Sequence, residues 1–276
     1  MCQSQQAESG GIVGAARSAR QTSHPLPAIR CRQEIGRSAM QWHEVSEQPA
    51  RVRVRDFTFE FAGHTIPGRL WLPSANAPVP LVLLGYGSGG HSHDGSRTWQ
   101  AEWFATHGVA AASIDVPGHG QRAAEDASLD YGLVADQIVA EWTHALDLLA
   151  ALPELDTARV AYRGQSMGTM LGLSFVAHEP RVVVACLGLA DLKNIPGRYS
   201  GIGDRLRRDA PDVCCPTLFV MNWDDELCDR DSSFELFGLL GTAEKELRAY
   251  PGKHGEISSE ATEAGLQFLL DRLQAA

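Results

Sequence analysis

The sequence predicts an α/β protein in which a mostly parallel, twisted sheet of about eight strands is covered by helices on both faces. Short, nearly continuous apolar runs are typical of strands buried on both sides. They alternate with segments whose apolar residues recur at helical spacing, the clearest lying at 129–149 and 259–273. A chain of 276 residues that is 44% hydrophobic is also long enough to bury one large core. The expected parallel strands are 81–84, 109–114, 160–162, 182–189, 217–221 and 247–250.

An antiparallel hairpin is expected before these strands. Valines alternate with arginines over residues 51–55, and phenylalanines alternate in the opposite phase over residues 57–61. This one-residue slip predicts a β-bulge near Arg55 and Asp56. Gly63 and His64 then turn the chain back into residues 66–72.

Domain organisation follows from the change in composition near residue 40. Residues 1–39 have few large apolar side chains and no sustained period, so we expect a disordered N-terminal arm, with Met40 as the natural start. Residues 40–276 are expected to form a single domain. Only about 20 residues separate Asp191 from Pro216, which is too few for a separate cap domain over the site.

Composition excludes several classes of partner. A net charge of −10 argues against nucleic acid, because proteins that bind it gather Lys and Arg on one face. The longest apolar runs are far shorter than the roughly 20 residues that span a bilayer, so no membrane association is expected. Six cysteines without a C-x-x-C pair favour reduced thiols and a cytoplasmic location. Both a monomer and a homodimer are compatible with the sequence.

One motif dominates the chain: an apolar strand that leads into Gly164-Gln-Ser166-Met167-Gly168 and then directly into a helical pattern. A serine held between a strand end and a helix start takes a strained backbone conformation, and glycines two residues away on either side avoid collisions. This arrangement exposes the hydroxyl and points the Met167 N–H at a developing oxyanion. The motif therefore predicts a nucleophile elbow with Ser166 as the nucleophile.

Two further segments supply the partners that a nucleophilic serine needs. A strand at 217–221 ends in the carboxylate pair Asp224 and Asp225, and the strand at 247–250 precedes a glycine turn that carries His254. Serine, aspartate and histidine in this order, each after a strand, are typical of the α/β-hydrolases. Asp224 has a plain alternative as a hydrogen-bonding residue at the strand end.

On these motifs the chain, from about residue 50 to its end, resembles the α/β-hydrolase superfamily, in particular its cap-less branch of dienelactone-hydrolase-like and acyl-peptidase-like serine esterases. The resemblance implies an α/β-hydrolase fold, with Ser166, His254 and Asp225 as the catalytic triad. The turn Asp115-Val-Pro-Gly-His119-Gly resembles the turn that this family has after its fourth strand, where His119 is expected to orient the backbone. Dienelactone hydrolases use a cysteine nucleophile, so Ser166 argues against that specific activity.

The segment Gly85-Tyr86-Gly87-Ser88 departs from the family pattern, which often has His-Gly there. It leaves the second oxyanion donor open between the N–H groups of Gly87 and Ser88, alongside Met167. Tyr86 and Trp223 are the expected substrate-binding residues.

The sequence thus predicts a serine hydrolase that cleaves small-molecule carboxylic esters through an acyl-enzyme and needs no cofactor and no metal. An amidase or peptidase on the same triad is one alternative, and a catalytically silent binding protein with this fold is another. The acyl and alcohol specificity has no sequence code of its own.

Two rival motifs carry less weight. Gly85-x-Gly87-x-x-Gly90 followed by Asp115 formally matches a dinucleotide-binding fingerprint, but the loop continues well beyond the third glycine before a helix can start. His91, His93 and Asp94 could form a metal site, although a polar loop at the rim of the pocket is the better interpretation without further ligands at fixed spacing.

Overall fold

The computed structural model describes residues 39–44, 52–125, 130–193 and 199–275 of the chain. The segment Arg37–Ala276 forms one compact unit. Of the arm expected at residues 1–39, all but Ala39 lies outside the described residues, so its disorder stays a prediction.

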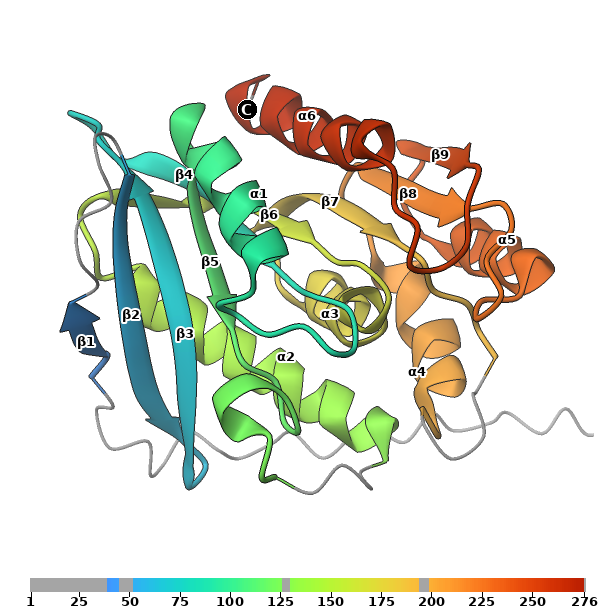
Figure 1. The fold of residues 1–276 in the computed structure, drawn as a ribbon, viewed down its shortest axis with the longest axis horizontal. Coiled ribbons are helices and arrows are strands. Elements are labelled where there is room, and N and C mark those ends of the chain that lie inside the picture. The colour runs from blue at the N-terminus through green and yellow to red at the C-terminus, as the bar shows by residue number, and fades with distance from the viewer. Residues whose placement is uncertain (1–38, 45–51, 126–129, 194–198, 276) are drawn as a thin grey trace, which may run out of the picture. The chain divides into compact units, whose positions relative to one another are not determined.

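A nine-stranded sheet runs through this unit in the order β1-β2-β3-β5-β4-β6-β7-β8-β9 (Figure 1). Strands β4 to β9 pair in parallel, whereas β1, β2 and β3 are antiparallel to their neighbours. The predicted α/β class is confirmed, and β1 is a ninth strand too short to be recognised from its sequence. The strands are β1 (Gln41–Glu44), β2 (Val52–Phe61), β3 (His64–Pro73), β4 (Val79–Leu84), β5 (Ala110–Ile114), β6 (Leu155–Arg163), β7 (Val182–Gly188), β8 (Thr217–Asn222) and β9 (Lys245–Tyr250).

The expected hairpin is present, but the bulge predicted in its first strand is not. β2 and β3 pair from Val52 to Phe61 without a shift in register. Val54 is buried in the hydrophobic cluster on one face of the sheet, whereas Phe57 and Phe59 are buried in the cluster on the other face. The prediction was wrong because the change in phase marks a strand whose two halves are covered on opposite faces, and not an inserted residue.

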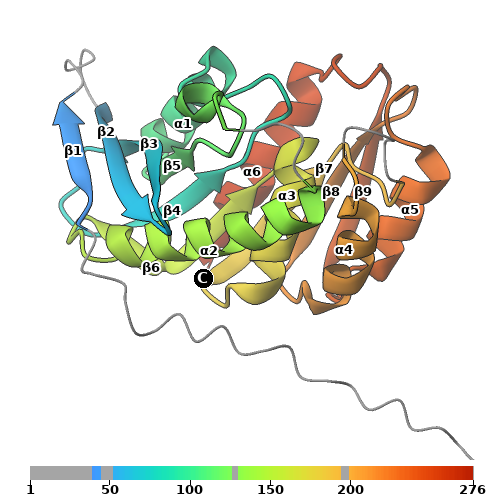
Figure 2. The same ribbon diagram turned by 90° about the horizontal axis from the view of Figure 1, so that it is seen from below.

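Helices cover both faces of the sheet (Figures 1 and 2). The cluster that contains Phe57 and Phe59 (the first cluster) packs against α2, α3, α4 and α5, and the cluster that contains Val54 (the second cluster) packs against α1 and α6. Strand β4 shows why this needs an unbroken apolar run: Leu81 and Leu83 enter the first cluster, and Val82 and Leu84 enter the second. The helices are α1 (Gly95–Thr106), α2 (Tyr131–Leu149), α3 (Met167–His178), α4 (Ile202–Asp209), α5 (Arg230–Leu239) and α6 (Ser259–Ala275), with 3₁₀ turns at Gly120–Arg122 and Ala210–Asp212.

The parallel arrangement decides where a site can form. Because β4, β6, β8 and β9 run in the same direction, the loops that follow them gather at one edge of the sheet. These loops carry the motifs at 85–94, 164–168, 223–229 and 251–257. Among the described helices, none has both the length and the hydrophobicity needed to cross a bilayer.

Candidate active site

Ser166 lies between the end of β6 and the first residue of α3 in a backbone conformation that L-residues rarely adopt, with φ 52° and ψ −119°. The Ser166 N–H donates to the Gly188 carbonyl, and the Ser166 carbonyl accepts from Thr169 and Met170 at the start of α3. The neighbouring strand β7 and the helix therefore both hold the turn in place. This is the strained strand-to-helix turn that the motif predicts.

Glycines at positions 164 and 168 are required by close backbone contacts. A Cβ atom on Gly164 would lie 2.6 Å from the Gly168 carbonyl oxygen, and a Cβ on Gly168 would lie 2.6 Å from the carbonyl carbon of Gly85. Both distances are shorter than real Cβ contacts allow. The elbow is thus packed against the loop after β4, which brings that loop beside Ser166.

His254 completes one side of the site from the loop after β9. Its Nε2 atom lies 2.8 Å from Ser166 Oγ, within hydrogen-bond distance for a base that accepts the hydroxyl proton. Its backbone N–H donates to Glu226 Oε2 at 2.9 Å, and this bond ties the histidine loop to the loop after β8. Glu226 was not recognised from the sequence, because no motif marks a side chain that caps a distant loop.

Asp225 lies on the other side of the histidine ring. Its Oδ2 and Oδ1 atoms lie 2.8 and 3.0 Å from His254 Nδ1, and Oδ1 also accepts the backbone N–H groups of Leu227 and Cys228 at 2.9 Å. Burial by itself would raise the pKa of Asp225, but the hydrogen bonds from His254 and the two N–H groups hold that pKa below its usual value. The carboxylate is therefore ionised at neutral pH and fixes the ring with the proton on Nδ1.

Asp224, the neighbouring candidate, is exposed, and its backbone N–H donates to the Gly252 carbonyl. Of the two adjacent carboxylates, the structure brings Asp225 to the histidine.

The loop after β4 lies opposite the start of α3. Met167 is buried as the first residue of α3, where backbone N–H groups lack an intrahelical partner. A Cβ on Gly87 would lie 3.7 Å from Ser166 Cβ, so this residue lies directly beside Ser166. Ser88 is exposed at the next position of the loop. The backbone nitrogen of Tyr86, between Gly85 and Gly87, also lies against the elbow, 2.7 Å from the position that a Cβ on Gly168 would take.

With this geometry in place, comparison with known proteins identifies the family. A family model described as esterase FrsA-like matches residues 36–195, which include Ser166 and end before Asp225 and His254. The chain belongs to the FrsA-like esterase family. Two curated relatives match about half of this chain, and the matches span about a third of each relative's own length. Hydrolase LUC6 from Fusarium sp is 32% identical over 155 residues (52% of this chain, 35% of the relative), and esterase FrsA from Serratia proteamaculans (strain 568) is 28% identical over 143 residues (51% and 32%).

Solved structures extend the similarity over most of the chain. A cold-adapted esterase from an Arctic intertidal metagenomic library, solved bound to PEG, is 35% identical, with a TM-score of 0.73 over 84% of this chain and 99% of its own. An acetyl xylan esterase from Paenibacillus sp. R4 is 21% identical, with a TM-score of 0.71 over 84% of this chain and 88% of its own, which shows the shared fold. The α/β-hydrolase fold predicted from the motifs is confirmed.

In this FrsA-like chain the two expected substrate-binding residues have different surroundings. The Tyr86 side chain is 2% exposed, and its hydroxyl accepts the Val116 N–H at 2.8 Å. The side chain therefore links the loop after β4 to the turn after β5. Trp223 is 47% exposed, and the Arg230 guanidinium lies 4.1 Å from its ring centroid. Trp223 is thus the one of the two that presents a large surface to solvent.

The Asp115 turn supports the loop after β4. Asp115 is fully buried and accepts the N–H groups of Ser92 and Gln121, each at 2.8 Å. In a dinucleotide-binding fingerprint the acidic residue that follows the glycines binds the ribose, but the Asp115 carboxylate already accepts two backbone N–H groups. His119 Nδ1 lies 3.1 Å from the Pro117 carbonyl, within the same turn, as expected of a residue that orients backbone.

The polar loop at residues 91–94 forms its own hydrogen bonds. His93 Nε2 lies 3.2 Å from Asp56 Oδ1, and its Nδ1 lies 2.7 Å from Ser92 Oγ. Asp94 caps α1 by accepting the Arg97 N–H. Among the described residues, the cluster with metal-ligand geometry is a different one, formed by Asp225, Cys228 and His254.

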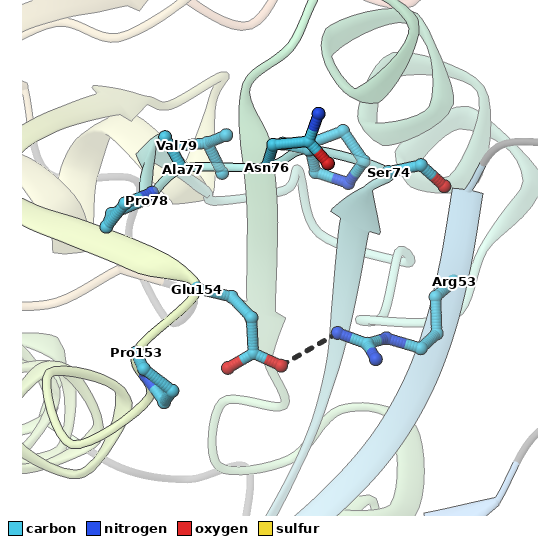
Figure 3. Close-up of a pocket in the computed structure, with 10 residues that line it drawn as sticks. Arg53, Ser74, Asn76, Ala77, Pro78, Val79, Pro153 and Glu154 are labelled. Atoms are coloured by element: carbon cyan, nitrogen blue, oxygen red, sulfur yellow. Dashed lines mark hydrogen bonds and ion pairs between the residues drawn. The ribbon is translucent and has the colours of Figure 1, made fainter.

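A separate hollow lies near the starts of β4 and β6, at the opposite end of these strands from Ser166 (Figure 3). Arg53 and Glu154 face each other across it in a 2.8 Å ion pair, and both side chains are at least 40% exposed. None of the described residues that line it is a histidine or a cysteine. The Glu154 carboxylate in the hollow is paired with Arg53, so the edge with Ser166 is the better candidate active site.

Proposed function

We propose that the chain hydrolyses carboxylic esters through an acyl-enzyme on Ser166. The observation that carries the proposal is the continuous set of hydrogen bonds from Asp225 through His254 to Ser166, with both contacts at 2.8 Å. Esterase names among the FrsA-like relatives support ester substrates over amides.

In this mechanism Ser166 Oγ attacks the ester carbonyl carbon while His254 Nε2 takes its proton. Asp225 stabilises the resulting imidazolium through Nδ1–H. The carbonyl π electrons move to oxygen, and the oxyanion accepts hydrogen bonds from the Met167 N–H and from the loop after β4, at Gly87 or Ser88. His254 then protonates the leaving alcohol as the carbon–oxygen bond breaks. A water molecule, deprotonated by the same ring, later releases the acid and restores Ser166.

The surroundings of the triad suit this chemistry. Ser166 is 8% exposed and the side chains of His254 and Asp225 are 14% and 6% exposed, so the hydrogen bonds are largely shielded from water. Trp223 is proposed as a substrate contact on the basis of its exposed ring, whereas Tyr86 is proposed to act by positioning the loop. The acyl-enzyme mechanism requires neither a metal nor a cofactor.

Fluorophosphonate labelling tests the nucleophile. Wild-type protein should be labelled once, and Ser166→Ala should abolish labelling and lower ester turnover by several orders of magnitude. Ser74→Ala is the matched control, because Ser74 is exposed at the opposite edge of the sheet, and it should label like wild type. Retained labelling of Ser166→Ala contradicts the mechanism.

Matched ester and amide substrates with the same acyl group separate an esterase from an amidase or peptidase. Faster turnover of the ester by at least about tenfold beyond the intrinsic reactivity difference is expected. Labelling without turnover of any ester or amide would instead favour the silent binding protein.

A further inference from the structure

A thiol lies beside the acid and base of the triad. Cys228 Sγ is 3.8 Å from His254 Nδ1, on the side of the ring that faces Asp225. The thiol sulfur, the imidazole nitrogen and a carboxylate oxygen all lie within 4.8 Å of one another. Cys228 is buried, and the reaction proposed above gives its side chain no role.

We propose that Asp225, Cys228 and His254 form a site for one thiophilic divalent cation, best matched by Zn²⁺, and that occupancy of this site inhibits the enzyme. Zinc binds sulfur, nitrogen and oxygen ligands at about 2.3, 2.0 and 2.1 Å in a tetrahedron, which places the ligand atoms roughly 3.3 to 3.6 Å apart. The observed sulfur–nitrogen distance is 3.8 Å and the nitrogen–oxygen distances are 2.8 and 3.0 Å. The sulfur–nitrogen and nitrogen–oxygen distances therefore each need to change by about half an ångström or less, and the sulfur must also approach the carboxylate oxygen, which lies within 4.8 Å of it, to seat the ion with water as the fourth ligand.

Inhibition follows from the tautomer of His254. During catalysis the ring carries its proton on Nδ1, facing Asp225, so that Nε2 can accept the proton of Ser166. A cation bound to Nδ1 takes the lone pair there and moves the ring proton to Nε2. The Cys228 thiol loses its proton to water as the metal–sulfur bond forms, so each ion bound releases one proton in all. The ring then presents Nε2–H to Ser166 and cannot act as a base.

The remaining contacts of the three ligands are compatible with this change. Asp225 Oδ1 accepts the Leu227 and Cys228 N–H groups, which leaves Oδ2 available to the ion once Nδ1–H is gone. Burial raises the pKa of Cys228, with the nearby carboxylates of Asp225 and Asp191 adding to the effect. The thiol is therefore protonated in the metal-free enzyme and leaves the triad intact.

Binding can be tested without catalysis by adding Co²⁺ to the full chain carrying Ser166→Ala. One equivalent should produce a thiolate-to-cobalt charge-transfer absorption band. The chain has six cysteines, so the band must be assigned: it should disappear in Ser166→Ala/Cys228→Ser and persist in Ser166→Ala/Cys214→Ser, where the exposed Cys214 is the matched control. Absence of the band, or a band that survives Cys228→Ser, overturns the site. Cys228→Ala serves as the second variant if the serine variant does not fold, since both keep the backbone N–H bond to Asp225.

Inhibition is tested separately, because it rests on the proposed esterase function. Zn²⁺ should inhibit ester turnover reversibly on chelation, and Cys228→Ser should raise the inhibitory concentration at least about tenfold relative to its own metal-free rate. Equal inhibition of wild type and Cys228→Ser overturns the inhibitory role. Failure of the esterase function itself would appear as absent turnover without metal, while the cobalt band would still report on the site.

Discussion

Replacing Asp225 by asparagine tests the triad most sharply, because the structure fixes how the new side chain must orient. Oδ1 accepts two backbone N–H groups, from Leu227 and Cys228, whereas Oδ2 faces His254 Nδ1. An asparagine oxygen will occupy the Oδ1 position, because an amide NH₂ there would face two donors. The amide NH₂ then occupies the Oδ2 position and donates to His254 Nδ1.

This orientation inverts the tautomer of the base. With Nδ1 as an acceptor, the ring proton resides on Nε2 and points at Ser166, so the hydroxyl has no acceptor for its proton. The same substitution in a related triad lowers turnover about 10⁴-fold, which corresponds to about 5.5 kcal/mol of transition-state stabilisation. We therefore expect Asp225→Asn to lose roughly four orders of magnitude in kcat with little change in KM.

Asp224→Asn is the matched control. Asp224 is adjacent, carries the same charge and is exposed, so its loss should cost less than about tenfold in kcat. Steady-state turnover of one ester, measured for both variants alongside circular dichroism, decides the question. A larger defect at Asp224, or a defect below about 100-fold at Asp225 with the fold intact, would refute the tautomer argument.

The contribution of Asp225 to the stability of the fold should depend on pH in a defined direction. The pKa of Asp225 is held below its ordinary value of 3.8, so its contribution to stability is complete above that pH and is lost as the pH falls through the lowered value. The difference in melting temperature between wild type and Asp225→Asn should therefore narrow as the pH falls below about 4. A difference that widens on acidification would contradict the direction of the shift.

Two further substitutions test the scaffold. Gly168→Ala places a Cβ 2.6 Å from the backbone of the loop after β4 and should lower ester turnover at least about 100-fold, because it displaces an oxyanion donor. Gly238→Ala is its control. A Cβ on Gly238 meets nothing within 4 Å, so the turnover of this variant should stay within about twofold of wild type. Glu141→Gln removes the buried carboxylate that binds Arg122 at 2.7 Å but leaves Glu125 as a charged partner of Arg122 at 2.9 Å. It should cost about 2 kcal/mol by urea unfolding. The exposed Glu263→Gln is its control and should cost less than about 0.5 kcal/mol.

The parallel part of the sheet could be predicted because burial on both faces leaves a direct mark on the sequence. An unbroken apolar run such as β4 has no other simple interpretation in a protein with helical segments on each side. The same principle explains why β2 has no bulge. A strand whose first half is buried on one face and whose second half is buried on the other shows the phase change of a bulge, and only its pairing with β3 distinguishes the two.

The residues of the candidate triad could be located from the sequence because each follows a strand in a fixed order, and the topology then brings the strand ends together. The elbow has a further mark in its glycines, since Gly164 and Gly168 are dictated by backbone contacts. The second oxyanion donor has no such mark. It depends on the path of a loop, and the N–H groups of Tyr86, Gly87 and Ser88 are adjacent along that path.

The contacts that surround the triad show where sequence reasoning stops. Cys228 follows Asp225 by three residues. The two side chains lie close together because the turn after β8 folds back on the Asp225 carboxylate, which accepts the N–H groups of Leu227 and Cys228. Glu226, between them, instead reaches the backbone of His254. Neither contact repeats with a period or matches a motif, since each depends on one turn meeting a loop that follows a different strand. A thiol beside His254 is therefore invisible in the sequence, although it lies 3.8 Å from the ring nitrogen that faces Asp225.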